Sequence, residues 1–387
     1  MAQALPGRPA KRERYSCVGG SHGRLLHCAE ADVTAYWILF AIWAAGAVQF
    51  ARRQYQAYNR SFYIFAATLT ALMIGLRYDV GGDWVTYLHM YETIAFQTLG
   101  PALTTTDPGY ALLNWISAGA DWGIWFPNLG CSILFMAGLA RLAWRQPNPW
   151  LAVLVAVPYL IIVVAMGYTR QAAAIGIICW AVADASPKRL GRLVLMIAFA
   201  ALFHKTAILF LPILLLPVVI RSPLLGIVGA VAFALLFNVF LGSSSDDLIN
   251  NYVNSDYNSQ GAAIRVAMNV VAAIIMLLLR NRLGLEDFAK SFWTNCSILS
   301  ILSVFALLAF SASSGVDRIA LFLIPLQVVT FSRIPYALST TGRPQFSGVL
   351  AVIGYSFAVQ FVWLNFADNA ELWKPYDTVL RADDLGQ

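Results

Sequence analysis

Long apolar runs alternate with short polar segments along almost the whole chain after residue 32. A helix that crosses a bilayer takes about 20 apolar residues, and the runs predict about twelve such spans, several of them short enough to be tilted, broken or re-entrant. The expected spans are 33–50, 61–76, 126–143, 150–167, 168–183, 190–203, 206–220, 223–241, 263–279, 291–311, 316–333 and 346–366. The pattern therefore predicts an all-α fold, a polytopic bundle of transmembrane helices.

The remaining segments set the expected domain boundaries. We expect a polar N-terminal extension at 1–32, a transmembrane domain at 33–366 and a C-terminal tail at 367–387. Residues 107–120 are only semi-apolar, and counting them as a span would spoil the distribution of charge among the loops. We therefore expect a periplasmic helix there that is interfacial or re-entrant.

The composition excludes the common soluble classes. Of the 387 residues, 59% are hydrophobic and 12% are charged, whereas a soluble domain carries about 25% charged residues. The mean hydropathy of +0.66 rules out an ordinary soluble enzyme, a disordered chain, a collagen-like chain and a coiled coil. The net charge of +6 does not indicate nucleic-acid binding, because most Lys and Arg lie in short loops between apolar runs. The expected partner is the lipid bilayer.

Basic residues divide the loops into two sets. One alternating set holds fourteen of them and comprises 51–60, 141–149, 184–192, 221–222, 280–290 and 333–345, whereas the opposite set, with the tail, holds seven. The positive-inside rule makes the first set cytoplasmic and the second, including 77–107 and 242–262, periplasmic. Five basic residues before Val33 disagree with this topology. Either the segment 1–32 is an upstream extension of the true start of the protein, or the first expected span, 33–50, is wrong.

Isolated cations lie at the ends of spans on the expected outer side. They are Arg77, Arg170, Lys205, Arg265 and Arg318. Charges at membrane depth are costly and usually face a cavity or a partner, although each could also snorkel to the interface. Snorkelling explains one arginine well, but it explains five cations on this face poorly. A convergent cationic cluster suits a polyanion, because guanidinium forks match phosphate oxygens.

The segment after the second span carries further candidate chemistry. Gly81 and Gly82 permit a tight turn, which would aim Asp83 at the outer cavity. Trp84 and Tyr87 either stack on sugar rings or belong to the aromatic belt at the interface. The four histidines lack the spacing of metal ligands, and we expect no metal and no cofactor.

Four motifs follow one another along the chain. They are Gly75-Leu76-Arg77 with Gly81, Asp83 and Tyr87; Thr169-Arg170-Gln171 followed by three alanines; Leu202-Phe203-His204-Lys205-Thr206-Ala207; and Asp317-Arg318-Ile319. In their order and spacing the motifs resemble those of the EpsG family of exopolysaccharide proteins, which is related to the Wzy-type polymerases. The chain departs from the family at Gly82, where the family often has Thr, and in the basic residues of its N-terminal extension at 1–32.

The resemblance implies a GT-C-like fold, a bacterial inner-membrane location and a glycosyltransferase activity. The implied reaction polymerises oligosaccharide repeat units carried on undecaprenyl pyrophosphate at the periplasmic face, in exopolysaccharide or O-antigen biosynthesis. The acceptor hydroxyl attacks the anomeric carbon of the donor glycan, and lipid pyrophosphate leaves. The implied partners are the lipid-linked glycan and, in the same pathway, a chain-length regulator and a flippase.

The resemblance also suggests roles for individual residues. The candidates to stabilise the leaving pyrophosphate are Arg170, Arg265 and Arg318. Arg77 either joins them or holds Asp83, and Asp83 or His204 is the candidate general base. Structural alternatives stay open, because Asp83 and Arg77 would also form a simple pair and His204 would also cap the helix that follows it.

Two other functions are compatible with the sequence. A flippase or exporter of lipid-linked glycans would also use a cationic cavity, but it would need polar residues through the depth of the bilayer, where these spans are nearly free of charge. A non-catalytic subunit of a polysaccharide synthase complex would need none of this chemistry. Activity is the property that separates these possibilities.

Overall fold

The structure is a computed structural model, and it describes residues 32–53, 57–185, 189–219, 222–242, 261–309, 313–340 and 342–381. Within these ranges the regular elements are helices, and one isolated antiparallel bridge joins Arg77 to Thr378. The all-α prediction is confirmed for this part of the chain. The expected extension at 1–32, apart from Asp32, and most of the expected 242–262 loop lie outside the described residues.

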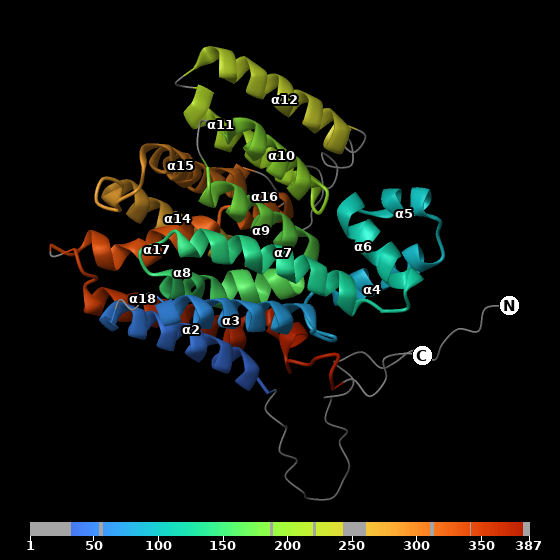
Figure 1. Cartoon of the computed structure of the whole chain (residues 1–387), viewed down its shortest axis with the longest axis horizontal. Helices are drawn as coiled ribbons and strands as arrows, with labels where there is room; N and C mark the ends of the chain where they lie inside the picture. The colour runs from blue at the N-terminus through green and yellow to red at the C-terminus, as the bar shows by residue number, and fades with distance from the viewer. Residues whose placement is uncertain are drawn as a thin grey trace, which may run out of the picture.

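Helices run side by side through the body of the molecule. The longer ones are α2 (Thr34–Arg53), α3 (Ala57–Gly75), α7 (Trp125–Trp144), α12 (Pro223–Leu241), α14 (Ala262–Leu279), α15 (Asp287–Ala309) and α18 (Phe346–Phe366). The shorter ones are α8 (Pro149–Ala156), η1 (Val157–Ala165), α9 (Thr169–Ala183), α10 (Leu190–Ala201), η3 (Lys205–Phe210), α11 (Leu211–Val219), α16 (Ser313–Leu321) and α17 (Pro325–Ala337). In Figure 1, α2, α3 and α18 form one side of this bundle and α12 lies at the opposite side.

Helix occupies at least part of every range in which we expected a span. Among the described residues, seven helical segments are long and apolar enough to cross a membrane, and they lie in α2, α7, α12, α14, α15, α16 with α17, and α18. Four further apolar helices of the described residues, such as Leu190–Ala201, are shorter, with 10–17 residues. The chain is therefore a multi-pass membrane protein. The count of about twelve spans and the likeness to GT-C folds remain predictions.

A central helix forms the core of the bundle. Helix α8 continues directly into η1, and every residue from Pro149 to Ala165 is buried. A helix that is hydrophobic on all sides has to be covered by neighbours on all sides. Its second half is a π-helix with Pro158 in its first turn. Proline lacks the backbone N–H that regular α-helical pairing uses, and a wider turn accommodates this loss.

Small residues allow α7 and α9 to approach closely beside this core. A Cβ atom placed on Gly138 would lie 1.7 Å from the carbonyl oxygen of Gly176, and one placed on Gly176 would lie 2.3 Å from the Cα of Phe135. Small residues at such crossings are typical of helix packing in membranes. The crossing fixes the position of α9, whose first residues belong to the candidate site.

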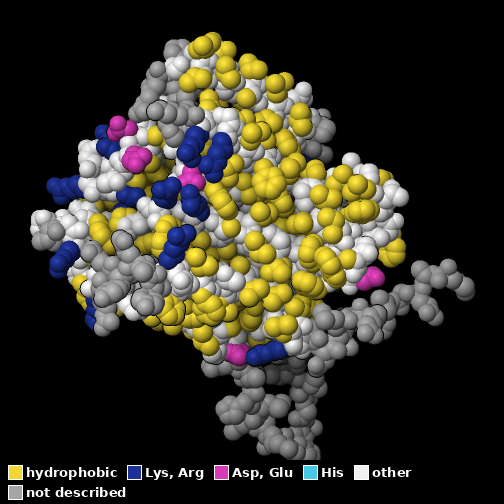
Figure 2. Space-filling view, viewed as in Figure 1, with side chains coloured by type: hydrophobic (Ala, Val, Ile, Leu, Met, Phe, Trp, Pro, Cys, Tyr) yellow, Lys and Arg dark blue, Asp and Glu magenta, His cyan; other side chains and the backbone are white. Residues whose placement is uncertain are grey.

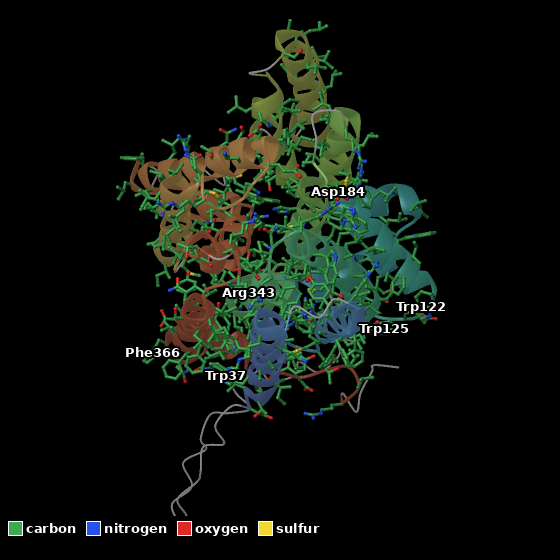
Figure 3. All side chains as sticks on the ribbon, turned by 60° about the vertical axis from the view of Figure 1, so that its left-hand side comes forward. Trp37, Trp122, Trp125, Asp184, Arg343 and Phe366 are labelled. Atoms are coloured by element: carbon green, nitrogen blue, oxygen red, sulfur yellow. The ribbon has the colours of Figure 1, made fainter. Side chains whose placement is uncertain are left out.

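Loops expected on the cytoplasmic side meet at one end of the bundle. Arg141 and Arg145 donate to Asp184 at 3.0 and 2.7 Å, and Arg333 Nη1 donates to the carbonyl of Leu283 at 2.7 Å. Figure 2 shows Lys and Arg gathered toward this end and hydrophobic side chains over most of the remaining face, and Figure 3 labels Asp184. The charge pattern grouped these loops correctly. Which side of the membrane they face remains a prediction.

Three helices lie together beside the other end of the bundle (Figure 1). They are α4 (Trp84–Ala95), α5 (Leu99–Thr105) and α6 (Pro108–Gly119). Helix α6 confirms a helix within 107–120, and its placement at an interface remains a prediction. Helices α4 and α5 were not expected. The buried residues of α4 are Trp84, Tyr87 and Ile94, too few to stand out as an apolar run.

The described part of the expected C-terminal tail folds back onto the bundle. It contains η5 (Asp368–Trp373), whose Trp373 donates from Nε1 to the carbonyl of Ile162 at 2.8 Å. Tyr36 donates to the carbonyl of Trp373 at 2.6 Å, and the Val379 N–H donates to the carbonyl of Leu76 at 2.9 Å. Residues 368–381 therefore contact the segment that connects α3 to α4.

Candidate functional site

Arg77 anchors the turn that follows α3. Its side chain is 1% exposed and donates to the carbonyl of Ile74 at 2.7 Å, to the carbonyl of Val80 at 3.2 Å and to Thr169 Oγ1 at 2.6 Å. The guanidinium thus ties the turn to the first residue of α9. Among the described residues Arg77 donates to these three acceptors and not to Asp83, so the simple Arg77–Asp83 pair is not formed in this structure.

The backbone conformation and the packing of this turn explain why it contains a glycine at position 81. Gly81 has φ +110°, a conformation that favours glycine, and a Cβ atom there would lie 2.2 Å from the carbonyl oxygen of Met166. Its N–H donates to the carbonyl of Leu372 at 2.9 Å. The turn is therefore held between the end of η1 and the C-terminal segment, and it delivers Asp83 to the start of α4.

Arg170, in the first turn of α9, points at the start of α6. Its Nη1 donates to Asp107 Oδ2 and to Thr106 Oγ1, both at 2.7 Å. Its Cζ lies 5.8 Å from the centre of the Tyr87 ring, within the range of a cation–π contact. The expected turn at residue 170 thus brings a guanidinium against α4 and α6.

His204 lies on the other side of the same carboxylate. Its Nδ1 is 3.8 Å from Asp107 Oδ2, beyond hydrogen-bonding distance, and its ring stacks on Phe322 at 6.1 Å between centres. His204 holds the N-cap position of η3, but its side chain makes no capping hydrogen bond. Asp107 Oδ1 instead accepts from the N–H of Lys205 at 3.1 Å. The alternative in which the His204 side chain caps this helix is therefore wrong.

Asp83 lies in the electric field of two arginines. Its side chain is half-buried at the start of α4, and burial raises the pKa of this carboxyl while the charges of Arg318 and Arg170 oppose the rise. Arg318 is exposed, and its backbone carbonyl accepts from Gln171 Nε2 at 2.6 Å. The Thr-Arg-Gln motif and the Asp-Arg-Ile motif therefore meet beside Asp83.

The pKa values of His204 and Asp107, which both lie between the expected spans, depend on each other. Burial lowers the pKa of His204 below its usual range, the Asp107 carboxylate opposes this, and Arg170 and Arg318 reinforce it. Burial alone would raise the pKa of Asp107, but His204, Arg170 and the N–H of Lys205 lower it overall. At neutral pH the site therefore holds an ionised Asp107 beside a neutral imidazole.

Arg265 is charge-balanced by the residue next to Arg318. Its Nη2 donates to Asp317 Oδ2 at 2.6 Å, its Nε donates to Asp317 Oδ1, and its Nη1 donates to Tyr159 at 3.0 Å. Bidentate guanidinium–carboxylate pairs of this kind are strong and fix geometry. The pair ties α14 to α16 and so places Arg318 at the end of a short, anchored helix.

Several buried polar atoms around Arg170 have no hydrogen-bond partner among the described residues. They are Arg170 Nε, both ring nitrogens of His204, Thr206 Oγ1 and Tyr110 Oη. Most buried polar atoms in proteins are hydrogen-bonded, so water or a polar ligand would be expected to satisfy these atoms. No three His, Cys, Asp or Glu side chains of the described residues converge as metal ligands do.

The EpsG family model matches residues 60–378, most of the chain. The chain belongs to the EpsG family. No curated protein and no solved structure matches it. The matched range contains all four motifs, the whole cluster around Asp107 and nearly all of the C-terminal segment that contacts the turn after α3. Family membership and the apolar helices together place this EpsG protein in a membrane, in polysaccharide biosynthesis.

The two aromatic residues expected to stack on sugar are buried in this EpsG protein. Trp84 is 6% exposed and packs edge-on against Tyr78, and Tyr87 is 3% exposed and packs edge-on against Tyr110. The Tyr87 oxygen lies 3.5 Å from the backbone nitrogen of Arg170, which donates to it. Both rings are buried in packing contacts in this structure, and their stacking on a sugar stays a prediction.

The structure thus brings most of the sequence-predicted residues into one region of the EpsG chain. Those that share it are Asp83, Arg170, His204 and Arg318, with Arg265 joined through Asp317 and Arg77 behind the turn. Two residues that help to build the site, Asp107 and Trp373, were not predicted from the sequence. Asp107 carried one weak signal, an Asp-Pro pair at a helix start, and Trp373 carried none, because it reaches the turn from the far end of the sequence.

Proposed function

We propose that this EpsG protein is a glycosyltransferase of the Wzy-like type. It polymerises oligosaccharide repeat units carried on undecaprenyl pyrophosphate, at the periplasmic face of the inner membrane, in exopolysaccharide or O-antigen biosynthesis. The observation that carries the proposal is the convergence of Asp83, Arg170, His204 and Arg318 at the end of the bundle opposite the basic loops. Such a site combines a proton acceptor with cations for a polyanionic leaving group.

The proposed reaction is a displacement at the anomeric carbon of the donor. The acceptor hydroxyl oxygen forms the new glycosidic bond while the bond from that carbon to the pyrophosphate oxygen breaks. The pyrophosphate leaves with the bonding electrons, and the hydroxyl proton passes to a base on the protein. Arg318, which is exposed, and Arg170, whose Nε has no partner among the described residues, stabilise the charge that develops on the pyrophosphate.

Exposure favours Asp83 as the base. Asp83 is half-buried, and burial raises its pKa, which makes it a stronger base than an ordinary aspartate. His204 is 9% exposed and lies behind Asp107, so it is the second candidate. Arg77 is assigned to the turn, and Arg265 to holding Asp317 and thereby Arg318. A chain-length regulator and a flippase of the same pathway are the proposed partners.

The decisive experiment is chain-length analysis of lipid-linked glycans in a deletion strain, complemented with wild-type protein or with Asp83→Asn. The proposal expects single repeat units on the periplasmic side in the deletion strain and with Asp83→Asn, and polymer with wild type. Loss of all periplasmic units would replace the proposal with a flippase. Full polymer with Asp83→Asn at matched expression would remove Asp83 from catalysis, and polymer in the deletion strain would indicate a non-catalytic subunit.

A further inference from the structure

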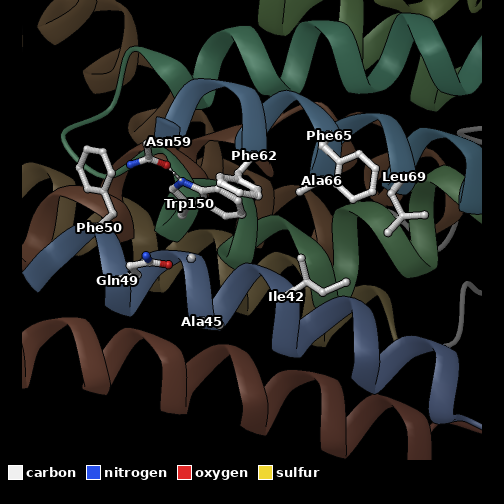
Figure 4. Close-up of a pocket in the computed structure, with 11 residues that line it drawn as sticks. Ile42, Ala45, Gln49, Phe50, Asn59, Phe62, Phe65, Ala66, Leu69 and Trp150 are labelled. Atoms are coloured by element: carbon white, nitrogen blue, oxygen red, sulfur yellow. Dashed lines mark hydrogen bonds between the residues drawn. The ribbon is translucent and has the colours of Figure 1, made fainter. Parts of the chain in front are cut away.

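A groove runs between α2 and α3, and none of the candidate site residues described above lines it (Figure 4). It encloses about 440 Å³, and its apolar walls include Ile42, Ala45, Phe62, Phe65, Leu69 and Trp150. Two of these side chains are largely exposed, Phe62 at 65% and Phe65 at 67%. Helix α2 is apolar enough to cross a membrane, and α3 contains most of the expected span 61–76, so the exposed side chains of the groove would face the hydrocarbon of the bilayer.

The floor of the groove is built by packing specific to this site. Trp150, from the buried α8, lies against α2 at Gly46, where a Cβ atom would come within 2.0 Å of the indole. The indole Nε1 donates to Asn59 Oδ1, which fixes the ring across the space between the two helices. The groove is thus a defined feature of the fold, because it depends on a glycine and a hydrogen bond.

One end of the groove is polar and the other is apolar. Figure 4 shows Gln49 and Asn59 at one end and Ile42 and Leu69 at the other. The polar end lies at the end of α2 and the start of α3, close in sequence to Arg52 and Arg60 of the expected cytoplasmic loop 51–60. Arg52 and Arg60 are both exposed there, and Arg52 Cζ lies 4.9 Å above the Phe346 ring.

The length of the groove matches one leaflet. Asn59 and Leu69 both line it, and their ten-residue separation along α3 corresponds to about 15 Å at 1.5 Å per residue. The hydrocarbon core of a bilayer is about 30 Å thick, so half of it is also about 15 Å. An occupant that starts at the polar end and follows the groove would therefore reach the middle of the bilayer.

We propose that this groove binds one acyl chain of an anionic phospholipid from the leaflet at the basic end. The hydrocarbon chain lies over Trp150 between Phe65 and Ile42, and the headgroup lies at the polar end, where Arg52 and Arg60 supply the opposite charge. Cations near a membrane surface favour anionic lipids in this way. An undecaprenyl carrier fits less well, because its pyrophosphate belongs at the opposite end of the bundle in the proposed function.

The test uses the full chain in vesicles of phosphatidylcholine and phosphatidylglycerol in equal amounts, followed by mild extraction and native mass spectrometry of the lipids that stay bound. Ala45→Trp fills the groove from an exposed position that lines it, and Ala41→Trp adds the same bulk at an exposed position one turn earlier, outside it. Wild type and Ala41→Trp should retain one phosphatidylglycerol. Ala45→Trp should retain at least about tenfold less, because each excluded CH₂ group weakens binding several-fold.

A second arm tests the headgroup and avoids bulky substitutions. Arg52→Gln with Arg60→Gln should abolish the preference for phosphatidylglycerol over phosphatidylcholine, while Arg343→Gln, exposed elsewhere on the basic end, should keep it. Brominated phosphatidylglycerol should quench wild-type fluorescence more than that of Trp150→Phe. Equal retention by the two Ala→Trp variants, or no lipid preference in wild type, would overturn the proposal.

Discussion

Asp107 Oδ2 lies 2.7 Å from Arg170 Nη1, a contact between residues 63 positions apart in the sequence. The same carboxyl group accepts from the N–H of Lys205 at 3.1 Å and faces His204 at 3.8 Å. One buried carboxylate therefore orients the guanidinium of α9 and fixes the start of η3. It also sets the charge of the site, because it balances the cation that the Thr-Arg-Gln motif contributes.

Removing the Asp107 charge should disturb both of its contacts. In Asp107→Asn, Arg170 loses its ionic partner, and breaking a buried pair costs about 3–5 kcal/mol when both partners are fully buried. Because the Arg170 side chain is 23% exposed, we expect a smaller loss of stability, about 2 kcal/mol, and polymerisation reduced by at least about tenfold. Thermal unfolding and polymer yield measure the two effects.

The matched control for this substitution is Asp121→Asn. Asp121 is exposed in the turn after α6, so the same chemical change there should leave unfolding and polymer yield unchanged. Asp107→Glu should recover part of the activity, because it restores the charge at a slightly different position. Equal behaviour of Asp107→Asn and Asp121→Asn would show that Asp107 does not position Arg170.

The pH profile should identify the base. Burial raises the pKa of Asp83 while Arg318 and Arg170 lower it, and a carboxylate base acts above its pKa, so activity should fall as pH decreases through that value. Arg318→Gln removes a charge that lowers this pKa and should move the acid limb to higher pH. His204→Gln should reduce the rate of polymerisation but leave the acid limb of the pH profile in place. If His204→Gln abolishes the limb, His204 is the base.

Much of the site follows from local sequence, because its residues lie in short motifs at helix ends. The turn at Gly81, the helix start at Thr169 and the break at His204 are local features, and charge distribution suggested that their cations converge. The partners of those cations are different. Arg265 pairs with Asp317 across 52 positions, and Arg77 is buried among carbonyl groups, contacts that only the packing of the helices creates.

The C-terminal segment illustrates the limit of local patterns most clearly. Trp373 lies against Gly167, where a Cβ atom would come within 2.4 Å of the indole, and against Gly82, where it would come within 3.3 Å. One indole thus supports both the turn before Asp83 and the residues before Arg170. Nothing in the sequence near residue 373 indicates these contacts, which depend on the return of the chain after α18.

This packing predicts that Trp373 positions the site without touching substrate. Trp373→Ala should destabilise the protein by about 3–5 kcal/mol, as large-to-small changes of buried aromatic residues do, and should reduce polymer yield. Gly167→Ala should have a similar effect, because the indole has to move. Gly119→Ala is the control and should be neutral, since no atom lies within 4 Å of its added Cβ. Normal polymer from stable Gly167→Ala protein would contradict this role.

The sidedness of the chain is open to a direct test by cysteine labelling. Thr104, in α5, and Gly191, in the first turn of α10, are exposed at opposite ends of the bundle. In a background with Cys17 and Cys28 replaced by Ser, an impermeant maleimide added to intact spheroplasts should modify Thr104→Cys and spare Gly191→Cys. The reverse pattern would place the candidate site in the cytoplasm. The remaining cysteines, Cys131, Cys179 and Cys296, are buried.

The arginine-to-lysine series separates fork geometry from charge. Arg170→Lys and Arg318→Lys keep the positive charge but replace a planar fork with a compact ammonium. If these residues stabilise the leaving pyrophosphate, each variant should lose about 3 kcal/mol of transition-state stabilisation, roughly a hundredfold in rate. Snorkelling predicts otherwise, because lysine snorkels as well as arginine does. Polymer length and yield at matched expression are the measurements.

The control for this series has to be an arginine of the basic end that makes no special contacts. Arg333 is unsuitable, because it donates hydrogen bonds to Gln146 and to the carbonyls of Leu283 and Gly284, so Lys there would disturb the packing of three loops. Arg343 is exposed, and Arg343→Lys should be neutral. Comparable polymer from Arg170→Lys, Arg318→Lys and Arg343→Lys would discard the pyrophosphate assignment and leave the outer arginines with a role in topology alone.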